Sequence, residues 1–277
     1  MIKTWGDVIK ENKDSIYLFG YGSLLNKQTH ENKHKKLIKA RVKGFKRVFG
    51  LSYDKNKCKD KKYNERFKES SKYLGEDFEI KWNKLIYKKN SGSLTVCESK
   101  DSKLNGLLLE IKREDYIKYA EREYKYILKE INVELYDKLE EKEIENKKIY
   151  ILLNKEELID NVEIYYLYQK ICRIGAYING VDFGVDYDET TYDRNGNKAY
   201  EEINRRFFKN GKKVKITNNL ITLNRFPELQ KEIINNDGEI GIILDKNKYM
   251  IKIFILNKNK EMWIDQGDLS LCSNEIY

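Results

Sequence analysis

The sequence predicts an α+β protein that ends in a small all-β region. Over residues 1–183, short alternating apolar runs typical of strands are interspersed with segments of helical periodicity. Over residues 211–277 only strand-like runs remain, separated by Asn, Asp, Gly and Lys turns. Hydrophobic residues make up 40% of the 277 residues and aromatic residues 12%, which is enough for a packed core although 36% of the residues are charged.

Most of the predicted elements lie in the first half of the chain. The predicted helices are residues 4–13, 26–38 and 112–124, with Asn26 as a cap of the second. The predicted strands are residues 15–19, 40–53, 91–99, 104–111, 126–136 and 147–153. A long insertion at 54–88 is polar and charged with scattered aromatic residues, and its structure stays unassigned.

The second half of the chain divides into a helical part and a strand part. Residues 157–183 carry apolar residues at helical spacing and are expected to fold back on the first half. The strand part contains KKVKIT, GEIGIIL, YMIKIFIL and EMWIDQGDLSL, which predict a small antiparallel β-barrel of SH3 type. We therefore expect one domain over 1–210, with the insertion at 54–88 and a helical extension at 155–210, and a second over 211–277.

Composition and charge bear on where the protein is located and which partners it binds. The chain contains no run of about 18 apolar residues that could span a membrane, and its polar N-terminus lacks an apolar signal core, so we expect a cytoplasmic protein. The net charge is +9, and nine Lys and Arg residues with one acid lie between Lys27 and Arg47. Because Lys, Asn, Ile and Tyr are abundant along the whole chain and no nucleic-acid motif occurs, a nucleic-acid partner is not expected on charge alone.

The number and spacing of the cysteines and histidines match no metal-binding motif. The four cysteines are far apart and form no CxxC pair: Cys58, Cys97, Cys172 and Cys272. The two histidines, His30 and His34, lie in a lysine-rich segment, so we expect no metal and free thiols in a reducing compartment. Cysteine–histidine catalysis stays open by counting alone.

The segment YLFGYGSLLNKQTH, residues 17–30, places a glycine on each side of Tyr21 where a predicted strand ends. Glycine lets the backbone approach another backbone or a ligand closely. A strand that ends in this way and leads into a helix leaves backbone N–H groups pointing outward, which suits an anion or an oxyanion. The same residues also fit a plain connection between a strand and a helix.

Nucleophile and nucleotide motifs are absent: there is no GxSxG, no HExxH, no P-loop and no GxGxxG in its usual setting. Several acids lie near predicted strand ends, namely Glu110, Glu114, Asp115, Glu121 and Glu123. Most are expected to be ordinary surface charges. Glu123 differs because it ends the predicted helix directly before a tyrosine-rich segment, where partial burial would suit a carboxylate to proton transfer near neutral pH.

Four segments together resemble the gamma-glutamylcyclotransferases: FGYGSLL (19–25), VKGFKRVF (42–49), SGSLTVCESKDSKLNGLLLEI (91–111) and YAEREYKY (119–126). They occur in the family's order across residues 15–153, with the third segment similar to a hairpin. The pair Arg122-Glu123 is similar to the glutathione-acting branch. Tyr119-Ala120 stands where the family often has Leu-Asp, and Tyr124 where it often has glycine. YQKICRIGAYINGVDF (168–183) resembles a helix that follows the core in longer relatives.

The resemblance implies a mixed β-barrel with flanking helices and a transferase or lyase of glutathione metabolism that needs no cofactor. It implies cyclisation of a small γ-glutamyl substrate to 5-oxoproline, with release of an amine, amino acid or dipeptide. Glu123 then corresponds to the catalytic general acid and base. The backbone of the YGSL turn corresponds to the anion or oxyanion site: Tyr21, Gly22, Ser23 and Leu24.

Three further residues have two interpretations each. Arg47 is a candidate for holding an anionic substrate, or forms a salt bridge at the surface or barrel rim. Tyr21 and Tyr126 line the substrate site, or are core aromatic residues. The alternative for the whole protein is a non-catalytic ligand-binding or adaptor protein on the same barrel, whose C-terminal barrel contacts a protein partner.

Overall fold

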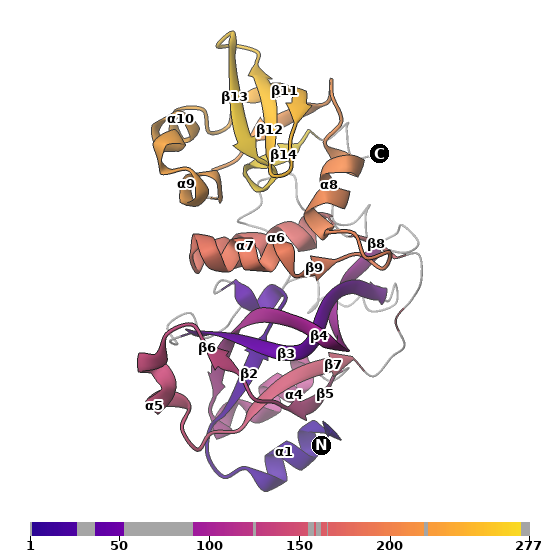
Figure 1. The fold of residues 1–277 in the computed structure, drawn as a ribbon, viewed down its shortest axis with the longest axis vertical. Helices are drawn as coiled ribbons and strands as arrows, with labels where there is room; N and C mark the ends of the chain where they lie inside the picture. The colour runs from indigo at the N-terminus through magenta and orange to yellow at the C-terminus, as the bar shows by residue number, and fades with distance from the viewer. Residues whose placement is uncertain are drawn as a thin grey trace.

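The computed structural model describes residues 2–26, 37–52, 91–123, 126–154, 158, 162–164, 166–218 and 221–272. Two β-sheets are separated by a layer that contains helices α6 (Tyr166–Ile178) and α7 (Val181–Glu189) (Figure 1). The predicted insertion at 54–88 and both histidines lie outside the described residues. Within the described ranges, no helix has the length and hydropathy that crossing a membrane requires.

The first sheet is mixed and has nine strands within the described part of the chain. Its strands are β1 (Ile2–Lys3), β2 (Ile16–Gly20), β3 (Leu37–Ser52), β4 (Ser91–Ile111), β5 (Tyr126–Glu130), β6 (Glu134–Leu135), β7 (Ile149–Asn154), β8 (Glu163–Ile164) and β9 (Thr191–Tyr192). The main order is β1-β5-β7-β2-β4-β3-β6, while β8 pairs with β4 and β9 with β3. The described pairings leave this sheet open, so the closed mixed barrel that the resemblance implies is not confirmed.

All five residues of strand β2 are buried, because β2 lies inside this sheet between β7 and β4. It runs antiparallel to β4 and parallel to β7. Such a strand is expected to be a continuous apolar run rather than an alternating one, which is what Ile16–Gly20 provides. The strand ends where Gly20 pairs with Leu107, and the turn that follows is itself largely buried in the core.

Helices and 3-10 turns connect and cover the sheets. Besides α6 and α7, the α-helices are α1 (Trp5–Glu11), α4 (Tyr116–Arg122), α5 (Glu141–Ile144), α8 (Ala199–Phe207), α9 (Ile221–Arg225) and α10 (Gln230–Asn235). The 3-10 turns are η1 (Ser23–Leu25), η4 (Arg113–Asp115), η5 (Lys138–Glu140), η6 (Pro227–Leu229) and η7 (Gln266–Asp268). Thr4 caps α1 with a capping box to Asp7, which explains why this predicted helix begins where it does.

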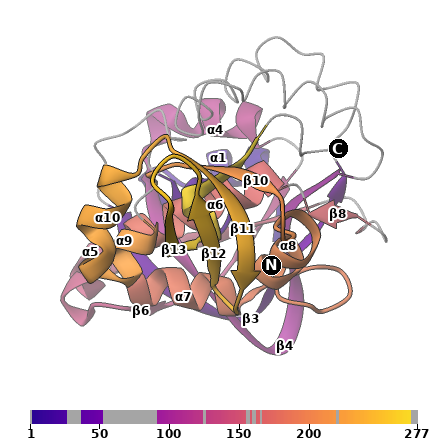
Figure 2. The same cartoon turned by 90° about the horizontal axis from the view of Figure 1, so that it is seen from above.

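The second sheet, here called the C-terminal sheet, is entirely antiparallel. Its strands are β10 (Lys213–Ile216), β11 (Ile240–Lys246), β12 (Met250–Ile255), β13 (Lys260–Asp265) and β14 (Leu269–Leu271), in the order β13-β12-β11-β10-β14. Seen from above, it overlies the α6–α7 layer (Figure 2). Its edge strands β13 and β14 do not pair within the described residues, so the predicted C-terminal barrel is not confirmed.

Several predicted boundaries are wrong. The predicted helix 26–38 fails at its end, because Leu37 and Ile38 begin β3, and 27–36 lie outside the described residues. The predicted hairpin within 91–111 is one strand, β4, whose register with β3 shifts between Lys43 and Phe45. Both halves of 91–111 pair with β3, which keeps them in one strand. The polar residues between the two halves lie where the register shifts and form no hairpin turn.

Other differences concern helices. The apolar run 157–183 gives two helices instead of one, because Gly180 at φ +122° breaks the chain after α6. The predicted strand 126–136 divides into β5 and β6. Helices α9 and α10, between β10 and β11, were not predicted. They are short, and their apolar residues are too few to produce a helical pattern.

Candidate functional site

The glycine turn follows β2 directly. Gly22 precedes η1, in which the Leu25 N–H donates to the Gly22 carbonyl at 2.9 Å and the Asn26 N–H to the Ser23 carbonyl at 3.0 Å. A Cβ on Gly20 would lie 2.7 Å from the Leu24 Cβ. The turn therefore folds tightly back on the end of its own strand, and glycine is needed there for steric reasons.

Helix α6 packs against this turn through two further glycine contacts. A Cβ on Gly22 would lie 2.9 Å from the Tyr168 hydroxyl oxygen, and a Cβ on Gly175 would lie 2.6 Å from the backbone nitrogen of Asn26. A side chain at position 22 would therefore meet the Tyr168 hydroxyl.

Tyr21 is buried beside the turn, and its hydroxyl donates to the Leu152 carbonyl at 2.9 Å. Burial raises the pKa of Tyr21 well above its usual value, and the nearby Tyr126 and Glu123 raise it further, while Arg47 acts in the opposite direction. Electrostatic coupling of this kind requires proximity. The fold therefore brings four of the predicted site residues together from three separate segments.

Glu123 follows the last residue of α4. Its N–H donates to the Tyr119 carbonyl at 2.8 Å, and its own carbonyl accepts from the Tyr126 N–H at 2.9 Å. The side chain of Glu123 is half-buried, as is that of Tyr126 at the start of β5. One tight connection thus fixes the predicted acid and a predicted tyrosine relative to each other.

Tyr168 on α6 lies against the glycine turn and was not among the residues selected from the sequence. Burial raises the pKa of Tyr168 well above its usual value, and Cys172, Tyr126 and Tyr21 raise it further. We call Tyr21, Tyr126 and Tyr168 the tyrosine cluster. The faint resemblance of 168–183 to a helix of longer relatives was the signal that pointed to this segment.

Arg47 is fully buried, so neither the surface nor the rim salt bridge considered for it is found. Its guanidinium donates to both the carbonyl and the side-chain oxygen of Asn105, to Thr191 Oγ1 at 2.9 Å, and lies over the Tyr187 ring at 4.3 Å. Within the described residues it makes no ion pair with a carboxylate. The more distant Asp186 offsets part of the Arg47 charge, and this charge lies close enough to lower the pKa of Tyr21.

Among the described residues, the buried Arg47 Nε lacks a hydrogen-bond partner. Thr95 is also buried, and its hydroxyl interacts with the Tyr21 side chain. A buried polar group without a partner is uncommon in native proteins. The half-buried Glu123 adds a carboxylate to the same region. No group of three or more His, Cys, Asp or Glu that could hold a metal occurs among the described residues.

No protein-family model and no curated protein matches the chain. The structure is similar to YkqA from Bacillus subtilis, with 16% identity and a TM-score of 0.36 over 62% of this chain and 51% of that one. The chain thus spans about half the length of that protein.

Two other similar structures carry a functional name. One is a gamma-glutamyl cyclotransferase, with 18% identity and a TM-score of 0.38 over 69% of this chain and 96% of that one. The other is a yeast gamma-glutamyl cyclotransferase specific to glutathione, with 16% identity and a TM-score of 0.34 over 57% and 78%. The structures to which this chain is similar therefore include members of the family that its sequence motifs resemble.

Proposed function

We propose that the protein is an enzyme of the gamma-glutamylcyclotransferase type. The observation that supports the proposal is the electrostatic interaction of Glu123 with the buried Tyr21, which lies in the glycine turn about a hundred positions earlier in the sequence. An ionisable acid beside a strand-to-turn junction of closely packed backbone is the arrangement that intramolecular acyl transfer needs.

In the proposed reaction, the α-amine nitrogen of the γ-glutamyl group attacks its own γ-carbonyl carbon. The new C–N bond closes the five-membered ring, and the γ-amide C–N bond breaks. Glu123 accepts the proton that the attacking amine loses and returns it to the departing nitrogen, so no net proton is consumed. The products are 5-oxoproline and a free amine, amino acid or dipeptide. Because both reacting groups belong to one molecule, positioning alone supplies much of the acceleration.

The backbone of residues 21–24 would hold the substrate's α-carboxylate or the developing oxyanion in this proposal. Arg47 would contribute through its charge from below the tyrosine cluster, not through a direct contact. Tyr126 and Tyr168 would contribute hydroxyl groups on either side of the turn. These roles are proposals that rest on the placement of the residues described above.

The experiment is to incubate the purified protein with glutathione, γ-glutamyl dipeptides and γ-glutamyl amines and to measure 5-oxoproline. We expect release from at least one class, which also identifies the leaving group. Folded protein that produces no 5-oxoproline from any of them contradicts the proposal.

The assignment of the base is tested with Glu123→Gln, which is expected to keep the fold and to lower kcat at least about a hundredfold. Glu121→Gln is the matched control because Glu121 is an exposed acid on the same helix. The control should retain its activity. Equal activities of the two variants would assign the proton transfer to another group.

A second candidate is a non-catalytic protein that binds a γ-glutamyl ligand on the same scaffold. The contact of Tyr168 with Gly22 favours it, because α6 covers the turn on which a substrate would have to lie. A thermal-shift measurement separates the two candidates. Stabilisation by a γ-glutamyl compound without 5-oxoproline release indicates binding alone, and turnover of the same compound indicates the enzyme.

A further inference from the structure

Helix α6 contacts the candidate site with one face and the C-terminal sheet with another. Tyr168 and Gly175 meet the glycine turn, as described above. Arg173 lies five residues after Tyr168, which places it about 7.5 Å further along the helix axis and about 140° around it. The helix therefore forms a rigid connection between the turn and the C-terminal sheet (Figure 1).

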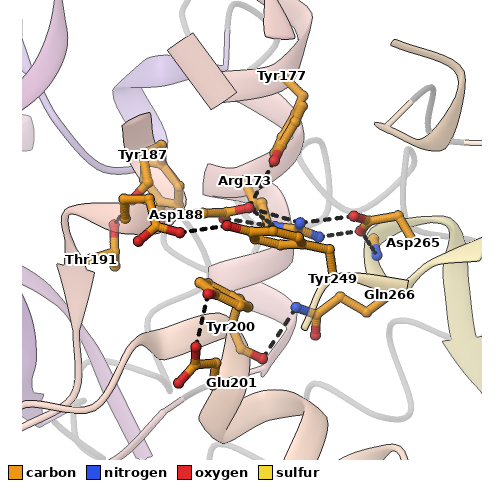
Figure 3. Close-up of polar contacts among 12 residues, drawn as sticks. Arg173, Tyr177, Tyr187, Asp188, Thr191, Tyr200, Glu201, Tyr249, Asp265 and Gln266 are labelled. Atoms are coloured by element: carbon orange, nitrogen blue, oxygen red, sulfur yellow. Dashed lines mark hydrogen bonds and ion pairs between the residues drawn. The ribbon is translucent and has the colours of Figure 1, made fainter. Parts of the chain in front are cut away.

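Arg173 is fully buried at the second contact, between two carboxylates (Figure 3). Its Nε donates to Asp188 Oδ1 at 2.8 Å and its Nη2 to Asp188 Oδ2 at 2.8 Å. Toward the C-terminal sheet, Nη1 donates to Asp265 Oδ1, and Nη2 to Asp265 Oδ2 at 2.9 Å. Asp265 is the last residue of β13, so a single guanidinium joins α6, α7 and the C-terminal sheet through two forked ion pairs.

Residues one and two turns away on the same face of α6 add further contacts. The Tyr166 hydroxyl donates to the Leu269 carbonyl at 2.9 Å, and Lys170 Nζ donates to the same carbonyl at 2.7 Å. The Tyr177 hydroxyl donates to Asp188 Oδ2 at 2.8 Å. Four side chains of α6, spread over three turns, are thus fixed by directional hydrogen bonds in place of apolar packing alone.

A buried arrangement of this kind is weak evidence for stability, because desolvating the charges offsets much of their attraction. The Arg173 ion pairs are distinguished by their geometry and not by their contribution to stability. A forked guanidinium–carboxylate pair fixes distance and orientation, whereas an apolar contact tolerates small shifts and rotations. Two forks on one arginine therefore fix both the axial position and the rotation of α6.

We propose that Arg173 and Asp265 are positioning residues: through them the C-terminal sheet sets the placement of α6, and so of Tyr168 against the Gly22 turn. The C-terminal sheet thereby takes part in a site that it does not line. Displacements of about 1 Å at a reacting centre can change rates by about a hundredfold, so such positioning has functional weight. The proposal rests on the proposed function only for its kinetic readout.

The first experiment measures amide hydrogen exchange in the full-length protein and needs no activity. In Asp265→Asn, which nearly preserves the side-chain shape, the amides of Leu25 and Asn26 should exchange at least about tenfold faster than in the wild type. The amides of β2 report global unfolding and should not change. Arg205→Ala is the matched control, because it breaks an ion pair whose arginine side chain is 76% exposed.

Exchange that rises only within β13, η7 and β14, with Leu25 and Asn26 unchanged, overturns the proposal. If Asp265→Asn also accelerates exchange in β2, Arg173→Lys is used instead. Lysine keeps the charge and lacks the forked geometry. Arg173→Lys must then accelerate the amide exchange of Leu25 and Asn26 without accelerating that of β2. If it does not, the proposal is overturned too.

The second experiment compares kinetics with γ-glutamyl substrates. If Asp265 acts through Tyr168, the losses of kcat/KM in Asp265→Asn and Tyr168→Phe should be clearly less than multiplicative in the double variant. If the losses of kcat/KM multiply in the double variant, Asp265 and Tyr168 act independently, and the proposal is overturned. A wild-type protein without turnover contradicts the proposed function only, since the exchange experiment still decides whether the C-terminal sheet positions α6.

Discussion

Two buried arginines, Arg47 and Arg173, lie on opposite sides of the α6–α7 layer and are held in different ways. Arg47 donates to carbonyl and hydroxyl oxygens, and burial lowers its pKa. Arg173 is equally buried, but Asp188 and Asp265 outweigh the effect of burial and hold its pKa well above the usual value. Arg47 thus makes no direct ion pair within the described residues, and only the more distant Asp186 offsets part of its charge, whereas Arg173 pairs with two carboxylates.

The difference indicates separate roles for the two regions. A cation without a carboxylate partner leaves positive potential in its surroundings, which favours a bound anion. A cation between two carboxylates leaves none and contributes fixed geometry. Under the two proposals above, the Arg47 region would serve binding, and the Arg173 region would hold the binding region in place.

The largest effect on stability is expected for Arg173→Met. Removing the shared cation leaves the buried Asp188 without its arginine and Asp265 with only the longer ion pair to Arg225 Nη1 at 3.4 Å among the described residues, which should lower the free energy of unfolding by about 3–5 kcal/mol. Urea denaturation measures this change. Adding Asp265→Asn to Arg173→Met should restore part of the loss, and no restoration would contradict the description of the pair as charge-coupled.

Arg47→Met should destabilise less, by about 1–3 kcal/mol, because it leaves only neutral acceptors without a donor. If the Arg47 charge supports anion binding, the KM for a γ-glutamyl substrate should rise about tenfold. Arg47→Lys keeps the charge and is the matched variant, in which KM should rise less. A loss of stability as large as that of Arg173→Met would erase the distinction between the two arginines.

A smaller effect tests the contact between the turn and α6. Gly22→Ala should lower kcat/KM, because its Cβ meets the Tyr168 hydroxyl at 2.9 Å. Tyr168→Phe removes that hydroxyl, so Gly22→Ala should be less harmful in the Tyr168→Phe background. A coupling of about 1 kcal/mol is expected from a double-mutant cycle. Independent effects would mean that the two residues do not meet in solution.

The smallest effect concerns Cys172, which lies beside Arg47 in the layer between the sheets. Burial raises the pKa of Cys172 to about 12. At pH 8 its thiolate fraction is then about 10⁻⁴ in the folded state, against about a tenth or more unfolded. Folding protects the thiol form, so this group's contribution to stability falls as pH rises from about 9 toward 12.

Iodoacetamide labelling followed by mass spectrometry checks the Cys172 prediction. Cys272, which is partly exposed, should react in the native protein at pH 8. Cys172 should react only after denaturation. Labelling of both at equal native rates would show that the layer around Arg47 opens readily.

The predicted strands were largely confirmed, because apolar alternation and buried runs specify which residues face a sheet. The strand 15–19 and the runs in 212–271 appear as β2 and as β10 to β14. Glu123 could be selected because it follows a helix directly before a tyrosine-rich segment. Tyr168 could not be selected in this way, since its apolar surroundings at helical spacing look like any buried helix.

The sequence by itself determined the local elements and the glycine turn, because strand burial and close backbone approach leave direct patterns in residue type. Only the tertiary structure decided that Arg47 is buried without a carboxylate, that Tyr168 touches Gly22, and that Arg173 joins α6 to Asp265. These contacts join residues 58 to 146 positions apart or depend on which face a helix presents. Local propensity carries no information about such pairs, because they form only when separate elements pack together.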